Sequence, residues 1–100
     1  MDNPLLHNPH AGEILKDEFL DELNMSNDDL AKFIHVSDSI INKIINGETP
    51  ITAEIDLRLC RYFQLSDGYF LRLQNDYEMM QAKRKLGETL NEIIPLTRVC

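Results

Sequence analysis

Five side chains with short polar groups or an amine lie on one side of the segment from residue 37 to residue 46. They are Ser37, Ser39, Asn42, Lys43 and Asn46. At the helical period these positions point away from the apolar residues of the same segment, so we expect them to be exposed. Hydroxyls and amides can bond base edges in a major groove, asparagine can form two hydrogen bonds with adenine, and lysine can reach guanine or a phosphate. The segment is therefore a candidate DNA-contacting helix.

The apolar residues between positions 27 and 46 fit two helices joined by a short turn. Six positions with the spacing of a helix-turn-helix hold apolar side chains: Leu30, Ala31, Ile34, Val36, Ile41 and Ile44. Ala31 is small where two steeply crossing helices would touch. Ser26 and Ser37 precede the two helices as N-caps, and Gly47 follows the second helix at a position that favours a left-handed backbone. The pattern predicts a helix-turn-helix over about residues 27–46.

Three more helices are predicted around this pair. The first covers about residues 11–23, the fourth runs from its cap Thr52 to about Phe63, and the fifth begins at its cap Ser66. Each helix has an apolar stripe that we expect to be buried. It consists of Leu15, Phe19, Leu20 and Leu23 in the first helix, and of Leu30, Phe33 and Ile34 in the second. In the fourth helix it consists of Ile55, Leu59 and Phe63, and in the fifth of Phe70, Leu73, Tyr77 and Met80. No segment alternates as strands do, so the predicted fold class is all-α.

The charge balance at first argues against a nucleic-acid-binding protein. The chain of 100 residues has 10 Lys and Arg against 17 Asp and Glu, a formal net charge of −7, whereas nucleic-acid binders usually carry a basic surface. The whole acidic excess lies in residues 1–50, and Glu13, Asp17 and Asp21 repeat every four residues in the first predicted helix. Two interpretations stay open for these acids: a solvated face, or a docking face for a basic partner.

Composition and spacing argue against most other classes of protein. No segment approaches the ~20 apolar residues of a membrane span, and no signal-peptide pattern is visible, so we expect a cytoplasmic protein without a membrane partner. Cys60 and Cys100 lack the spacing of a metal site, as do His7, His10 and His35. The four glycines are isolated, so no phosphate-binding loop is present. We expect Cys60 to be a small buried residue, and we predict no catalytic residue, metal, cofactor or small-molecule ligand.

Longer motifs identify the chain as a member of a known family. The segment DLAKFIHVSDSIINKIINGETPIT is similar to the LAxxLGVSxxxxSxxLNGxxxIT core of the lambda-repressor-like, Cro/C1-type helix-turn-helix family. The preceding HAGEILKDEFLDELNMS resembles the HPGEILxEEFLxPLxxS opening of the HigA (VapI-type) antitoxins, and ITAEIDLRLCRYFQLSDGYFLRLQNDYEMMQAK resembles the segment that follows their core. The similarity extends from about His10 to Lys83.

The resemblance implies a five-helix lambda-repressor-like domain at residues 10–83, an N-terminal arm at 1–9 and a C-terminal extension at 84–100. It also implies three partners: double-stranded operator DNA contacted by the helix from Ser37 to Asn46, a HigB-type toxin, and a second copy of the chain. A HigA-type antitoxin neutralises this basic, RelE-like ribonuclease toxin and represses its own operon as a dimer. Candidate dimer contacts lie on the fifth helix and on the extension: Leu86, Leu90, Ile93 and Ile94.

Several residues depart from the family pattern in ways that bear on DNA binding. His35 stands where glycine is usual, at a position that commonly needs a positive φ. Asp28, Asp29, Asp38 and Glu48 bring carboxylates to the expected phosphate path, and each lost phosphate contact lowers the affinity for DNA. Two alternatives therefore stay open: a stand-alone transcriptional repressor of the same fold, and a protein-binding antitoxin with weakened DNA binding.

Overall fold

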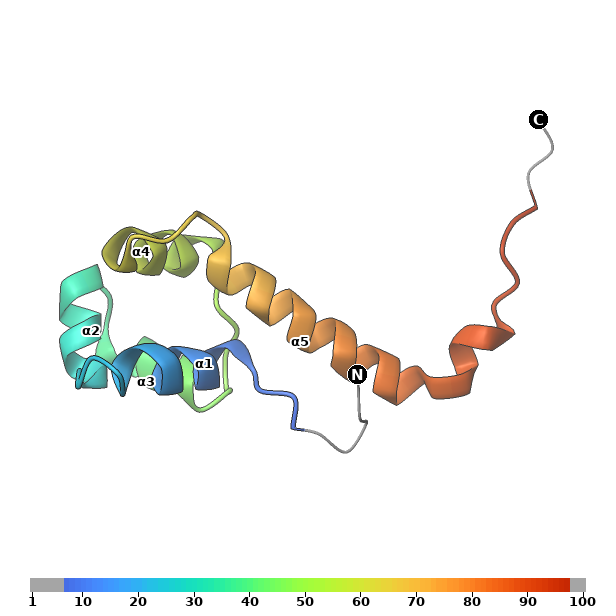
Figure 1. The fold of residues 1–100 in the computed structure, drawn as a ribbon, viewed down its shortest axis with the longest axis horizontal. Helices are drawn as coiled ribbons and strands as arrows, with labels where there is room; N and C mark the ends of the chain where they lie inside the picture. Colours follow the sequence, from blue (N-terminus) through green and yellow to red (C-terminus); the bar gives the residue numbers. More distant parts are fainter. Residues whose placement is uncertain (1–6, 98–100) are drawn as a thin grey trace.

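The computed structural model describes residues 7–97, and this part of the chain is helical without any strand (Figure 1). Its elements, in chain order, are α1 (Ala11–Ile14), the π-helix η1 (Leu15–Leu20), α2 (Asn27–Ile34), α3 (Asp38–Ile45), α4 (Ala53–Phe63), α5 (Tyr69–Leu86) and the 3-10 helix η2 (Gly87–Glu92). Figure 1 shows α1 to α4 gathered into one body from which α5 extends as a rod. The prediction of an all-α fold with five helices is confirmed.

The first predicted helix, residues 11–23, differs from the structure in its second half. After one α-helical turn the chain widens into η1, where the N–H of Asp21 donates to the carbonyl of Lys16, five residues earlier. A turn with five-residue hydrogen bonds brings residues five apart onto one side, and Leu15 and Leu20 are accordingly both buried. The prediction for Leu23 is wrong, because the helix ends at Leu20 and this side chain is 55% exposed.

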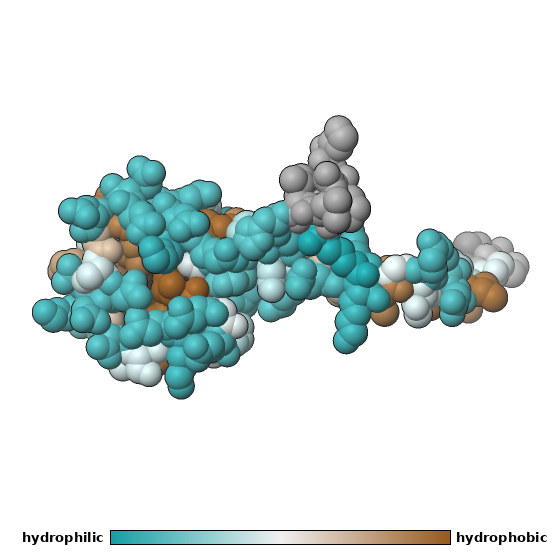
Figure 2. Space-filling view, turned by 90° about the horizontal axis from the view of Figure 1, so that it is seen from below, coloured by the Kyte–Doolittle hydropathy of each residue, from teal (hydrophilic) through white to brown (hydrophobic). Residues whose placement is uncertain are grey.

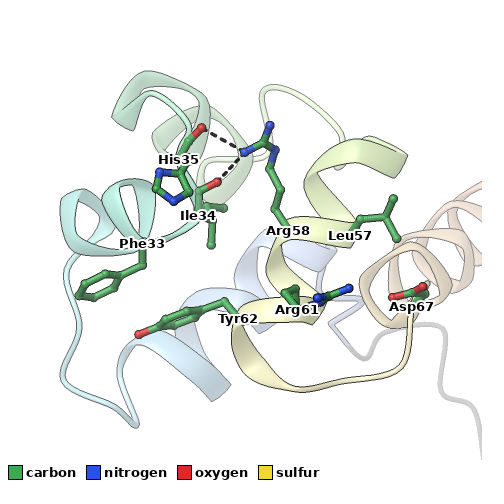
Figure 3. A pocket seen from close by; sticks show the side chains of 8 residues that line it. All are labelled: Phe33, Ile34, His35, Leu57, Arg58, Arg61, Tyr62 and Asp67. Carbon is green, nitrogen blue, oxygen red and sulfur yellow. Dashed lines mark hydrogen bonds between the residues drawn. The ribbon is translucent and has the colours of Figure 1, made fainter.

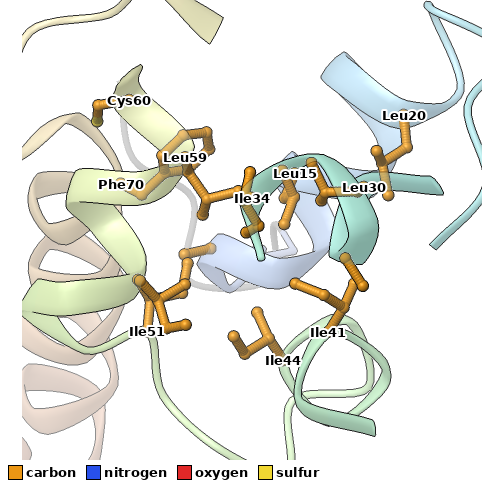
Figure 4. Close-up of a cluster of buried hydrophobic side chains, with 13 residues drawn as sticks. Leu15, Leu20, Leu30, Ile34, Ile41, Ile44, Ile51, Leu59, Cys60 and Phe70 are labelled. Carbon is orange, nitrogen blue, oxygen red and sulfur yellow. The ribbon is translucent and has the colours of Figure 1, made fainter. Parts of the chain in front are cut away.

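The core lies where α1, η1, α2, α3, α4 and the first turn of α5 meet (Figure 4). Its largest fully buried side chains are Phe70, Leu15, Leu20, Leu30, Ile41, Ile44, Leu59, Asp56 and Cys60. Fully burying one large apolar side chain contributes about 1.5–3 kcal/mol, so this shared cluster holds the short helices together. The expected burial of Cys60 is confirmed.

The predicted stripes of α2 and α5 are only partly buried, and Phe19 of η1 and Phe63 of α4 are likewise half-buried at the edge of the core. Phe33 of α2 is 51% exposed and its ring stacks on Tyr62 of α4, with the ring centroids 5.4 Å apart, so the prediction that it belongs to the core is wrong. On α5 only Phe70 is buried, whereas Leu73, Tyr77 and Met80 are intermediate. The cause is the direction of α5, which leaves the body soon after its first turns (Figure 1).

The second half of α5 and the extension after it pack against little of the body. Every described residue from 81 to 97 is exposed, and the radius of gyration of 17.1 Å exceeds the ~13 Å of a compact 100-residue domain. Five large apolar side chains are exposed here, Leu86 at 40%, Leu90 at 43%, Ile93 at 65%, Ile94 at 87% and Leu96 at 82%. Figure 2 shows the corresponding apolar surface on the narrow part of the molecule. A row of uncovered apolar residues on a thin rod is typical of an interface.

Candidate nucleic-acid interface

Local hydrogen bonds set the limits of the helix-turn-helix formed by α2 and α3. The hydroxyl of Ser26 accepts from the N–H of Asp29 at 3.0 Å, and the hydroxyl of Ser37 accepts from the N–H of Ile40 at 3.4 Å. Between the helices, His35 has φ 62° and ψ 49°, the left-handed conformation. Both predicted caps and the predicted strained turn are therefore confirmed.

The inner sides of α2 and α3 pack against each other as the spacing predicts. Leu30, Ala31 and Ile34 of α2 and Ile41 and Ile44 of α3 are all at most 3% exposed. Val36, the sixth predicted apolar residue, lies in the turn, where it is half-buried and packs at the edge of the core. This packing leaves the opposite side of α3 free to meet a ligand.

The outer side of α3 brings the five predicted contact residues to the surface. Ser37, Ser39, Asn42, Lys43 and Asn46 are all exposed. Their exposure and their place on one short helix suit insertion into a major groove. Ile40 is 39% exposed on the same helix, where an apolar group can contact a thymine methyl.

Asn42 has a partner that sequence reasoning missed. Its Oδ1 accepts a hydrogen bond of 2.8 Å from Nδ2 of Asn27, the first residue of α2. This bond orients the amide of Asn42: both N–H groups of Nδ2 and the second lone pair of Oδ1 are left for a ligand. A base edge that bonds Asn42 therefore shares Oδ1 with Asn27. No local pattern signals this contact, because the two residues lie on different helices.

Carboxylates surround the outer face of α3. A hollow of about 290 Å³ at the junction of α2 and α3 is lined by Asp28, Lys32 and Asp38, among others. Asp29 and Glu48 are also exposed. The helix-turn-helix therefore presents Lys32 and Lys43 among four acids, and its field opposes the approach of a polyanion.

Arg58 of α4 fixes the turn of the helix-turn-helix from behind (Figure 3). Its Nη1 donates to the carbonyls of Ile34 and His35, at 2.8 and 3.2 Å, and its Nη2 donates to Glu54 at 3.0 Å. These carbonyls end α2, where a cation satisfies unpaired acceptors and the negative end of the helix dipole. Sequence reasoning missed this residue, because its partners lie 23 and 24 residues away.

A cleft of about 800 Å³ opens beside Arg58, between α2 and α4. Phe33, Leu57 and Tyr62 supply its apolar wall, and the charged residues Arg58, Arg61 and Asp67 also line it (Figure 3). In residues 7–97 no three His, Cys, Asp or Glu side chains gather as metal ligands. None of the helices described is both long and apolar enough to cross a bilayer.

Comparisons with known proteins agree with this geometry. The HTH_3 helix-turn-helix family model matches residues 16–70. Virulence-associated protein I of Dichelobacter nodosus is 41% identical over 88% of this chain and 81% of its own length. The structure of the Pseudomonas aeruginosa antitoxin HigA with the higBA promoter is 37% identical, with a TM-score of 0.82, over 91% of this chain and all of that one. An addiction module antidote protein of the HigA family from Coxiella burnetii is 30% identical, with a TM-score of 0.83, over 92% of this chain and all of that one. The chain belongs to the Cro/C1-type helix-turn-helix family and, within it, to the HigA (VapI-type) group.

Proposed function

We propose that this protein is the antitoxin of a HigBA-type module, which neutralises a RelE-like ribonuclease toxin and represses its own operon as a dimer on operator DNA. The observation that carries the proposal is the exposed polar face of α3, in a fold that matches an antitoxin solved with its promoter. Ser37, Ser39, Asn42, Lys43 and Asn46 are the proposed DNA-contacting residues.

The exposed apolar rod supports the dimeric part of the proposal. A two-fold dimer matches a palindromic operator with one recognition helix for each half-site. Leu86, Leu90, Ile93 and Ile94 are 40–87% exposed in the described part of the chain, and burying them against a second copy removes apolar surface from water. We therefore place the dimer contact on the far half of α5 and on the extension.

A gel shift with the DNA upstream of the gene tests the DNA-binding part. We expect the protein alone to bind this DNA at about 50 mM salt and to lose most of the binding at about 200 mM, because affinity falls steeply with salt when phosphate contacts supply it. Addition of the basic toxin should restore binding at the higher salt. An absence of binding at low salt, with and without the toxin, would refute operator binding. Tight binding by the protein alone at the higher salt would refute the weakening effect of the four acids.

Acids at the end of the first helical segment are the proposed contact for the toxin. Asp17, Glu18 and Glu22 are exposed, whereas two neighbouring acids already have partners. Asp21 pairs with Lys16 at 3.1 Å. Glu13 accepts a hydrogen bond of 2.8 Å from His7, which is the main reason that the pKa of Glu13 lies below its usual value. The sequence spacing suggested one continuous row of free acids, and the structure replaces it with a smaller cluster around η1.

Charge reversal tests this contact. The triple variant Asp17→Lys, Glu18→Lys and Glu22→Lys should slow toxin association and flatten its dependence on salt, because long-range attraction governs the association rate of charged partners. A matched control reverses three exposed acids away from η1 and from the proposed dimer contact, namely Asp67, Asp76 and Glu78. Stopped-flow mixing with the toxin measures both rates. Equal association rates in the two variants would mean that the acids around η1 form a solvated face and do not contact the toxin.

The acids beside α3 also favour one alternative, a protein-binding antitoxin with weakened DNA binding. Asp28 and Asp38 lie around the same hollow at the start of the recognition helix, where a phosphate contact would be expected in a strong DNA binder. A stand-alone repressor differs from both candidates in lacking a toxin. A neighbouring reading frame for a small basic ribonuclease-like protein would exclude the stand-alone repressor.

A further inference from the structure

A buried carboxylate joins α4 to the start of α5. Asp56 is 1% exposed and is the one buried charged side chain in the part of the chain described. Its Oδ2 accepts from the N–H of Gly68 at 2.6 Å, and its Oδ1 accepts from the N–H groups of Phe70 and Leu71 at 2.9 and 3.1 Å. The first N–H groups of a helix have no partner within the helix, and hydrogen bonds to an ionised acceptor are among the strongest in proteins. The cap of α5 therefore comes from another helix.

This arrangement corrects the prediction that Ser66 caps the fifth helix. The helix begins two residues later than that cap would require, its N-cap is Gly68, and no side chain of the N-cap residue bonds the first turn. Because Asp56 belongs to α4, its three hydrogen bonds fix where α5 begins and also which way α5 points from the body.

Two further contacts hold α5 to the body beyond its first turn. Gln74 accepts from the N–H of Ile51 at 2.6 Å and donates to the carbonyl of Ile51 at 2.9 Å. Asn8 donates to the carbonyl of Tyr77 at 3.1 Å. Nδ2 of the same Asn8 also donates to Oε1 of Gln81 at 3.5 Å. From Phe70 the helix runs past these contacts toward the exposed apolar residues, so it acts as a lever whose far end is Leu86.

Small changes in the direction of this lever have large effects at its end. About 24 Å of helix separates Phe70 from Leu86, at 1.5 Å per residue. A tilt of about 8° at Phe70 therefore moves Leu86 by about 3.4 Å, which is the rise of one base pair. In a dimer joined at the far ends of the levers, such a tilt changes the distance between the two α3 helices by a comparable amount.

We propose that Asp56 is a positioning residue that selects the half-site spacing of the operator by fixing the direction of α5. The inference rests on the proposed dimeric binding of operator DNA. Asp56 contacts no DNA in this mechanism. It acts through the backbone of Gly68, Phe70 and Leu71, through the α5 rod, and through the dimer contact on Leu86 and the residues that follow.

The test compares operators whose half-sites are one base pair closer, native, or one base pair further apart. The wild type should prefer the native spacing by roughly tenfold or more. Asp56→Asn keeps the size of the side chain but loses the charge and turns an N–H donor toward backbone donors, so we expect the preference to fall below about threefold. Asp67→Asn is the matched control, since it neutralises an exposed carboxylate beside the same helix start, and it should keep the wild-type preference.

Fluorescence anisotropy gives the dissociation constant for each operator, and light scattering and circular dichroism establish that the variants stay dimeric and helical. If Asp56→Asn does not fold, Gln74→Leu carries the test, because it releases the second attachment of α5 and leaves its cap intact. A variant that weakens binding to all three operators equally, with the wild-type ratio between them, overturns the inference and leaves the proposed function standing. Failure of the wild type to bind any operator overturns both.

Discussion

Substitution of Gly12 by alanine is expected to lower the free energy of unfolding by about 3 kcal/mol. A Cβ at this position would lie 1.9 Å from the carbonyl oxygen of Ile44 and 2.8 Å from its carbon. Both clashes are with backbone, so α1 and α3 would have to separate, and no side chain can rotate to relieve them. The separation would disturb the end of α3 that carries Asn46.

Urea unfolding followed by circular dichroism measures this effect. A loss of about 3 kcal/mol corresponds to a Tm lower by roughly 12–24 °C in a domain of this size. Glu18→Ala is the control, because it places the same residue type on an exposed position of η1 and should change stability by less than about 0.5 kcal/mol. A change below about 1 kcal/mol for Gly12→Ala would show that the contact between α1 and α3 can open at little cost.

Replacement of Asn42 and Lys43 together by alanine is expected to raise the dissociation constant for operator DNA by roughly 30- to 1,000-fold, or about 2–4 kcal/mol. Asn42 would lose a donor to a base edge, and Lys43 would lose a contact with guanine or a phosphate. If the lysine contacts a phosphate, its loss should also reduce the slope of log affinity against log salt by about one. Both side chains are exposed, and the variant loses only the hydrogen bond between Asn42 and Asn27, so stability should change by no more than about 1.5 kcal/mol.

Anisotropy titrations at two salt concentrations separate the two contributions. The control variant removes the same residue types elsewhere, Asn75 on α5 and Lys16 on η1, and should bind the operator as the wild type does. Unchanged affinity and unchanged repression by the Asn42→Ala, Lys43→Ala variant would mean that α3 does not contact the operator. That result would favour the alternative function, a protein-binding antitoxin with weakened DNA binding.

The net charge of −7 does not show that exposed acids of this chain form two separate groups. One group of acids lies beside α3, where carboxylates oppose the approach of phosphate. Another group lies on and just after η1, where Asp17, Glu18 and Glu22 are exposed. A fold that reads bases with a few side chains tolerates such a balance. In the proposed function the two clusters bear on different partners, DNA and the toxin.

The sequence by itself determined the helix-turn-helix. Ser26 and Ser37 bond N–H groups three residues ahead, and His35 makes a turn within its own few residues. Interactions of this range are decided by neighbours in the chain, so spacing alone predicts them. The same holds for the buried side of α3 and for its exposed polar face, because a helix repeats its pattern every few residues.

Only the tertiary structure decided which contacts join these helices and in which direction each helix runs. The cap of α5 comes from Asp56, Arg58 closes the end of α2, and Asn27 orients Asn42. Each of these contacts unites two elements that are 14 to 24 residues apart in the chain. Such pairs depend on how the core packs, and the core also decides that Phe33 lies outside it. Periodicity describes one helix at a time, whereas the direction of α5 and the shape of the interface arise from contacts between helices.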